Sequence, residues 1–128
     1  MNYKGGVFQV ATAASTNAYG GTLRIPVHPE TGSGSAMGIS YELAPGEASR
    51  EIRLAMSECG LCALQGDGMV RIGEKEQGFA VGDLAFVPAR TTFVIRNTGD
   101  TPLVIAGLIS PPDPDMLRIA GLWGRTEH

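Results

Sequence analysis

The chain has few charged side chains, which make up only 18% of its 128 residues. Basic and acidic residues are interspersed and the net charge is -3, so no stretch offers the positive surface that nucleic acids or anionic membranes require. No apolar run approaches the length that spans a bilayer, and the first residues lack the charged and apolar segments of a secretion signal. We therefore expect a soluble cytoplasmic protein with no nucleic-acid or membrane partner.

Cysteine and histidine are also scarce, with two of each. Cys59 and Cys62 form Cys-Gly-Leu-Cys, whose spacing is that of a redox pair or of half a zinc site. Both fall in a predicted strand, however, where residues three apart face opposite sides of the sheet. Because no second CxxC completes a zinc site, we expect two separate thiols that are buried or half-buried.

Glycine and proline, in contrast, are plentiful, with 18 and 8 residues spread along the chain. They separate short apolar segments, a pattern typical of many strands joined by turns in a sandwich or barrel. A chain of this length with 43% apolar residues is the size of one domain with a single core. The predicted strands are residues 7–10, 22–27, 36–43, 50–55, 59–65, 69–72, 84–87, 92–97 and 103–109.

The last part of the chain predicts a short helix. Asp113 can cap its N-terminus, with Pro114 at the first helical position. An apolar stripe then follows at helical spacing, formed by Met116, Leu117, Ile119, Ala120 and Trp123. The stripe fits a lid packed on the barrel, or alternatively a contact in a dimer.

Two segments carry glycines and prolines in the order and spacing of a known pair of motifs. The motif residues are Pro45, Gly46, Cys59, Gly66 and Gly68 in the first segment, and Gly82, Asp83, Pro88 and Asn97 in the second. Together they resemble the two motifs of cupins, over about residues 22–112. The resemblance implies an all-β, cupin-like double-stranded β-helix, or jelly-roll barrel. Residues 1–128 would form one such domain, with a helical tail at 113–128.

In cupins these motifs aim three histidines and a glutamate at one metal ion. On this sequence the first two histidine slots fall at Ile52 and Leu54, the glutamate slot at Cys59 and the last histidine slot at Phe93. A zinc or iron ion needs three or four N, O or S donors, and three of these side chains offer only carbon. The resemblance therefore implies a barrel without the usual metal, and we expect no cofactor.

The apolar slots allow two interpretations. The side chains either fill the barrel as ordinary core or line a metal-free pocket for a small, largely apolar organic molecule. Alternation along the strands places further residues on the same inward faces. The predicted pocket residues are Met37, Tyr41, Ile52, Leu54, Cys59, Leu61, Ala63, Gln65, Phe93 and Ile95.

Cys59 is the candidate catalytic residue, because the motif register points it inward. A nucleophilic thiol requires a nearby base, and neither His28 nor His128 is obviously placed to act as that base. An inward arginine could instead lower the pKa of the thiol, and the candidates are Arg24, Arg53 and Arg71.

A substituted metal site is a further hypothesis, with His28, Glu51, Glu58 and Cys59 as its donors. A one-residue bulge would be needed to turn Glu58 inward. The function we expect first is metal-independent binding of a small organic molecule in the barrel, extended to an isomerase or cyclase if the cavity holds a general acid or base. The alternatives are a non-catalytic ligand-binding or sensor module and a dioxygenase-like metal enzyme with substituted ligands. We also expect a homodimer.

Overall fold

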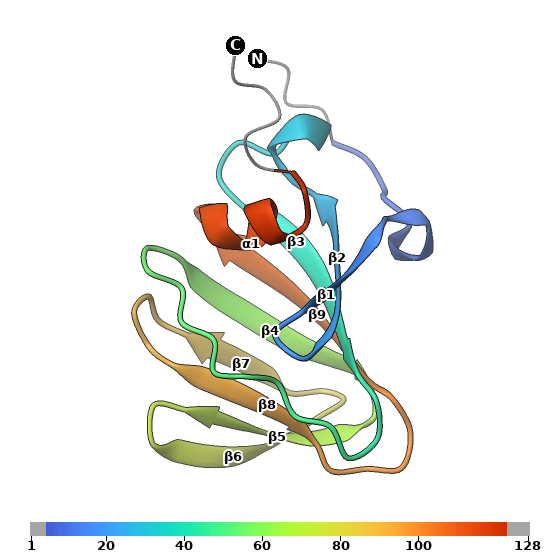
Figure 1. The fold of residues 1–128 in the computed structure, drawn as a ribbon, viewed down its shortest axis with the longest axis vertical. Coiled ribbons are helices and arrows are strands. Elements are labelled where there is room, and N and C mark those ends of the chain that lie inside the picture. The colour runs from blue at the N-terminus through green and yellow to red at the C-terminus, as the bar shows by residue number, and fades with distance from the viewer. Residues whose placement is uncertain (1–4, 123–128) are drawn as a thin grey trace.

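The computed structural model describes residues 5–122, and their strands form two antiparallel sheets that face each other as layers (Figure 1). The larger sheet has the order β1-β2-β3-β9-β4-β7, with strands Ser15–Ala18, Gly21–Val27, Met37–Leu43, Leu103–Ser110, Glu58–Gln65 and Leu84–Val87. The smaller sheet has the order β6-β5-β8, with strands Lys75–Ala80, Asp67–Ile72 and Phe93–Asn97. This is the predicted jelly-roll arrangement, and the core lies between the two sheets.

The short helix α1 (Pro114–Ile119) starts as predicted, since the carboxylate of Asp113 accepts a hydrogen bond from the backbone N–H of Met116 at 2.9 Å. Met116 and Leu117 are buried, so the helix packs on the barrel core as the lid interpretation expects. Ile119 is 45% exposed, which makes the apolar stripe narrower than predicted, and Trp123 lies outside the described residues. In the part of the chain that the structure describes, no helix has the length and apolar character needed to cross a membrane.

Two predicted strands are wrong. Residues 7–10 form no strand, and a 3₁₀ helix, η1 (Val10–Thr12), begins there instead; Val7 is 97% exposed, so its β propensity finds no sheet to pack against. Residues 50–55 run beside β8 without forming a regular ladder. Only Ile52 makes a bridge, exchanging backbone hydrogen bonds with Phe93 at 2.9 and 2.8 Å.

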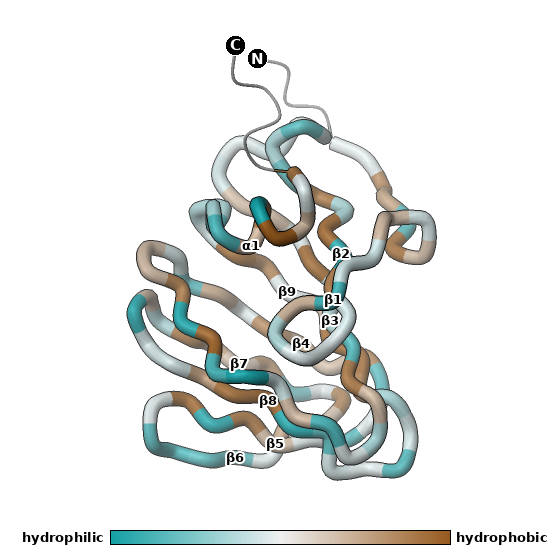
Figure 2. The backbone as a smooth tube through the Cα atoms, in the orientation of Figure 1, coloured by the Kyte–Doolittle hydropathy of each residue, from teal (hydrophilic) through white to brown (hydrophobic). Residues whose placement is uncertain are grey.

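Two further strands, β1 and β6, were not predicted because β1 is mostly polar and β6 begins with three polar residues. Figure 2 shows the first half of β6, residues 75–77, as hydrophilic, and four of the six residues of the strand are exposed. It lies at the edge of the smaller sheet. Because one face of an antiparallel sheet can be exposed to water, the outward side chains of such a strand can be polar. β1 likewise lies at an edge, and the two-residue turn that joins it to β2 sets its pairing. A second 3₁₀ helix, η2 (Pro29–Thr31), follows β2.

Candidate ligand-binding site

A small apolar cavity lies between the two sheets. Its volume is about 20 Å³, which is room for about one water molecule. The lining comprises Tyr19, Leu23, Ile39, Tyr41, Ile52, Cys59, Leu61, Phe93, Ile95, Ile109 and Met116. In this conformation the barrel is therefore filled by its own side chains, as the core-filling interpretation expects.

Tyr19 reaches the cavity from the tight turn between β1 and β2. Ala18 pairs with Gly21, so Tyr19 and Gly20 form a two-residue hairpin loop, and their φ angles of 55° and 86° are those of a type I′ turn. A positive φ is unfavourable for a bulky residue such as tyrosine. Figure 1 shows this turn, in blue, in front of β4 in that view.

Two hydrogen bonds to one carbonyl oxygen fix the backbone of this turn. The hydroxyl of Tyr41 donates to the carbonyl oxygen of Tyr19 at 2.9 Å, and the backbone N–H of Arg50 donates to the same oxygen at 2.8 Å. The hairpin also passes very close to the Tyr41 ring, because a Cβ atom on Gly21 would lie 2.6 Å from Tyr41 Cζ. The turn is thus clamped between the larger sheet and the segment that carries Arg50.

Both tyrosines are neutral near pH 7. Burial, with the charges of Asp113 and Asp115 adding to it, raises the pKa of Tyr19 to about 12. Burial also raises the pKa of Tyr41, with a smaller contribution from Glu47. Their hydroxyls are therefore hydrogen-bond donors and not bases.

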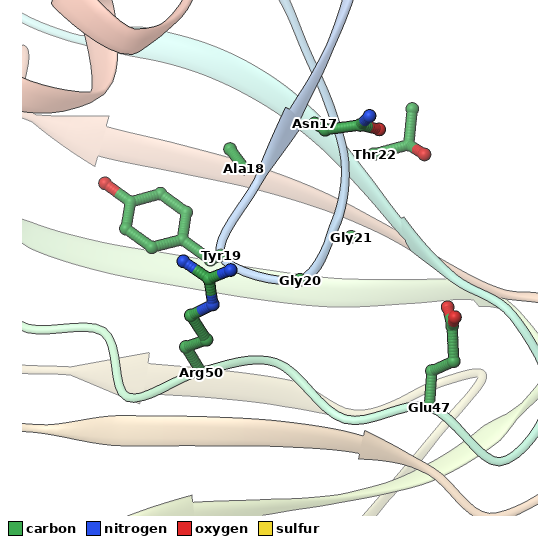
Figure 3. Close-up of a pocket in the computed structure, with 8 residues that line it drawn as sticks. All are labelled: Asn17, Ala18, Tyr19, Gly20, Gly21, Thr22, Glu47 and Arg50. Carbon is green, nitrogen blue, oxygen red and sulfur yellow. The ribbon is translucent and has the colours of Figure 1, made fainter.

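A polar groove of about 360 Å³ lies beside the same turn, and Figure 3 shows the residues that line it. Its lining is Asn17, Ala18, Tyr19, Gly20, Gly21, Thr22, Glu47 and Arg50. In Figure 3 the guanidinium of Arg50 points toward Tyr19, while the carboxylate of Glu47 lies apart from it at the other end of the groove. Tyr19 lines both the groove and the apolar cavity, and it is the one residue that the two linings share.

Several solved structures have the same arrangement of two sheets. KdgF from Halomonas sp. superposes with a TM-score of 0.75 over 89% of this chain and 100% of its own, at 17% identity. The polyketide cyclase RemF from Streptomyces resistomycificus gives 0.73 over 87% of this chain and 82% of its own, at 11% identity. The Cnp3 cupin domain of Schizosaccharomyces pombe gives 0.70 over 93% and 82%, at 13% identity.

The chain has the cupin fold. The predicted cupin barrel is thereby confirmed, and at these identities the similarity concerns the fold alone. No protein-family model matches the sequence, and no curated protein matches it.

The cupin motifs bring three of the four expected ligand slots together. Ile52, Cys59 and Phe93 all line the cavity, whereas Leu54 is buried in the core but does not reach it. One thiol beside apolar side chains does not provide the three or four donors that a cupin metal ion needs, so these residues do not fit a metal. Within residues 5–122, no group of three or more histidine, cysteine, aspartate or glutamate side chains is placed to hold a metal ion.

The substituted metal site is likewise not assembled. The carboxylate of Glu51 forms an ion pair with Arg71 at 3.6 Å, and Glu58 is exposed on the outer face of β4. Nδ1 of His28 accepts a hydrogen bond from the backbone N–H of Glu30 at the start of η2. The bulge that would turn Glu58 inward is absent at this point, because the register of β4 against β9 is regular from Glu58 to Ala63.

Cys59 is not activated as a nucleophile. Its side chain is 2% exposed, and burial raises the pKa of its thiol to about 12, so the thiolate is scarce near pH 7. The guanidinium of Arg24 donates to the carbonyl oxygen of Ala13 at 2.7 Å, and Arg71 pairs with Glu51. Burial is the cause of the raised pKa, and the expected arginine that would lower it does not take part.

Cys62 faces away from Cys59, as strand alternation predicts. It is half-buried on the outer face of β4, and both cysteines are free. The CxxC spacing therefore forms neither a disulfide nor a shared metal site in this cupin barrel.

The remaining predicted pocket residues divide between cavity and core. Tyr41, Leu61 and Ile95 line the cavity, whereas Met37 and Ala63 are buried elsewhere in the core. The inward placement of Gln65 is wrong: the residue is exposed and its side-chain amide donates to the carbonyl oxygen of Pro102 at 3.2 Å. A register shift between Ala63 and Gln65 breaks the alternation on which the prediction rested.

The most important lining residue missing from the prediction is Tyr19. The strand before it, β1, is polar and gave no signal, although the Gly20-Gly21 pair that follows Tyr19 is typical of a tight hairpin turn. The other cavity-lining residues that the prediction omitted could have been found from the sequence. Leu23, Ile39 and Ile109 lie on predicted strands, and Met116 lies on the predicted helix.

Asn97, the last residue of the second cupin motif, has a structural role. Its amide donates to the carbonyl oxygens of Leu43 at 3.0 Å and Thr101 at 2.9 Å, and its Oδ1 accepts from the backbone N–H of Gly99 at 2.9 Å. These bonds fix the turn after β8, so the motif asparagine supports the barrel end and does not touch the cavity.

Proposed function

We propose that this cupin-fold protein binds a small, largely apolar organic molecule in the barrel without a metal ion. The observation that supports the proposal is the position of Tyr19, the one residue that lines both the apolar cavity and the open groove. The cavity as it stands accepts about one water molecule, so binding requires this side chain to move.

The Tyr19 ring is suited to act as a displaceable plug. Its backbone is held by two hydrogen bonds, but its hydroxyl makes no hydrogen bond with any other residue in the range 5–122. The ring itself is the size of benzene, which occupies an apolar cavity of about 150 Å³ when one is made in a protein core. Rotation of the ring into the groove would therefore release a space suited to one aromatic ring or a branched alkyl group.

Binding fits the cavity better than catalysis does. An isomerase or cyclase needs a group that takes up and releases protons near neutral pH. The titratable groups that line the cavity are Tyr19, Tyr41 and Cys59, and burial raises the pKa of each of them. The fold neighbour RemF is a polyketide cyclase, so a cyclase whose tyrosine hydroxyls donate to a substrate oxygen is the second candidate.

The test uses indole as the probe and nuclear magnetic resonance as the readout. In the wild-type protein we expect indole to shift the methyl signals of Ile39, Leu61 and Ile95. Tyr19→Ala removes the plug, and we expect it to bind indole at least about tenfold more tightly, because the cost of displacing the ring disappears.

Phe86→Ala is the matched control, since this aromatic side chain is 58% exposed on the outer face of the larger sheet. It should bind indole as the wild type does. If neither the wild type nor a folded Tyr19→Ala protein shows shifts at millimolar indole, the barrel is plain core and the proposal is wrong.

A further inference from the structure

The two spaces that Tyr19 lines differ in chemistry. The cavity is lined by aliphatic and aromatic side chains, while the groove presents Asn17, Thr22, Glu47 and Arg50. If a molecule takes the place of the Tyr19 ring, one end lies among apolar side chains and the other end lies in the polar groove. The site therefore selects molecules with two chemically different ends.

Arg50 is the cation at the polar end. It is exposed, it has no carboxylate within 4 Å among residues 5–122, and its guanidinium points toward Tyr19 (Figure 3). By contrast, Arg71, Arg96 and Arg118 are each paired with an acidic residue. The backbone N–H of Arg50 is bonded to the Tyr19 carbonyl oxygen, which holds the guanidinium beside the plug.

Glu47 is the acidic residue of the same groove, and its charge opposes an anionic ligand. Its Oε1 atom accepts a hydrogen bond from the backbone N–H of Ala44 at 3.0 Å, so the carboxylate is held by its own turn. In Figure 3 it also lies at the end of the groove away from Tyr19. An anion beside Tyr19 is therefore closer to the free guanidinium than to this carboxylate.

We propose that the ligand is a small carboxylic acid with an aromatic or branched apolar body. The body occupies the space of the Tyr19 ring, and the carboxylate accepts hydrogen bonds from Arg50, whose planar guanidinium matches the two carboxylate oxygens. This inference rests on the proposed barrel site and adds the chemical class of its ligand.

The test compares two probes that differ only at one end, 3-phenylpropionate and 3-phenylpropan-1-ol, by isothermal titration calorimetry. We expect the wild type to bind the acid about tenfold more tightly than the alcohol, because hydrogen bonds between charged groups are stronger than neutral ones. Arg50→Gln should bring the two affinities together by weakening only the acid.

Arg53→Gln is the matched control. Arg53 is exposed on the same segment, carries the same charge and does not line the groove. It should keep the preference for the acid, which separates recognition by Arg50 from a general effect of positive charge. An acid preference that survives Arg50→Gln would overturn the assignment to Arg50.

The two proposals fail in different ways. Equal binding of acid and alcohol by the wild type would overturn the carboxylic-acid class while leaving the barrel site in place. Absence of binding by either probe, in both the wild type and Tyr19→Ala, would overturn the barrel site and the ligand class together.

Discussion

Gly21 is the position where the smallest substitution should most disturb the mouth of the barrel. A Cβ atom there would lie 2.6 Å from Tyr41 Cζ, 2.7 Å from Tyr41 Oη and 2.8 Å from the carbonyl oxygen of Glu42. Real Cβ contacts are not this short, and one of the three atoms belongs to the backbone of a paired strand. Gly21→Ala must therefore push the hairpin away from Tyr41.

Two contributions set the expected decrease in the free energy of unfolding of Gly21→Ala. Overpacking a tight site costs about 1–3 kcal/mol. Displacement of the hairpin also breaks the hydrogen bond from the Tyr41 hydroxyl to the Tyr19 carbonyl oxygen, which contributes about 1 kcal/mol. We expect the free energy of unfolding to fall by about 2–4 kcal/mol, a shift in the urea midpoint of roughly 1–2 M for a domain of this size.

Urea unfolding followed by circular dichroism measures this change, and Gly60→Ala is the control. Gly60 also lies in a strand of the larger sheet, but a Cβ atom there meets nothing within 4 Å. This control should change the midpoint little. A Gly21→Ala protein within about 0.5 kcal/mol of the wild type would contradict the clamped hairpin, since ordinary surface substitutions stay within that range.

Four further outcomes can be measured. Iodoacetamide at pH 8 should alkylate the half-buried thiol of Cys62 well before that of Cys59, because burial raises the pKa of the Cys59 thiol to about 12. Equal alkylation rates of the two cysteines by mass spectrometry would contradict the burial of Cys59. Folding raises the pKa of the Cys59 thiol from 9.0 to about 12. The contribution of the neutral thiol to the free energy of unfolding should therefore be fully present below pH 9 and be lost as the pH rises toward 12. Phe93→Ala should lower the free energy of unfolding by about 3–5 kcal/mol in thermal or urea unfolding, because it empties a site that is 4% exposed. The expected homodimer should form through the outer face of the larger sheet, where Leu84 and Leu108 are 82% and 63% exposed beside a groove of about 470 Å³ without charged residues. Changing both leucines to glutamate should then give monomers by sedimentation velocity, whereas a wild type that is already monomeric at 100 µM would refute this interface.

The features of the barrel that could be predicted from the sequence are those that depend on residues close together in the chain. Gly82 has a positive φ that glycine adopts readily, and the Asn97 side chain bonds the turn after β8; the spacing of such residues marked the cupin motifs. Period-two alternation placed Cys59 and Cys62 on opposite faces for the same local reason. Alternation failed at Gln65, because a bulge depends on how two strands pair and has no signal in one strand alone.

The mouth of the barrel could not be predicted, because its parts meet only in the folded chain. Tyr19 lies on a turn between a polar edge strand and β2, and its partner Arg50 lies on a segment predicted as a strand that forms only one bridge. Tyr19, whose carbonyl oxygen accepts the hydrogen bond, and Arg50, whose backbone N–H donates it, are 31 positions apart in sequence. Such a contact is set by tertiary packing, which overrides the strand propensity of residues 50–55.

Replacing metal ligands with Ile52 and Phe93 changes how a barrel of this kind can recognise a ligand. A metal site offers a fixed, open coordination position, whereas these apolar side chains leave only about 20 Å³. Under the proposed binding, a ligand would compete with Tyr19 for the space, and its apparent affinity would be the intrinsic affinity multiplied by the fraction of molecules in which the ring is displaced. Apolar contacts alone discriminate weakly between molecules of similar size. Under the same proposal, selectivity would come from the groove, where Arg50 has no carboxylate within 4 Å among residues 5–122.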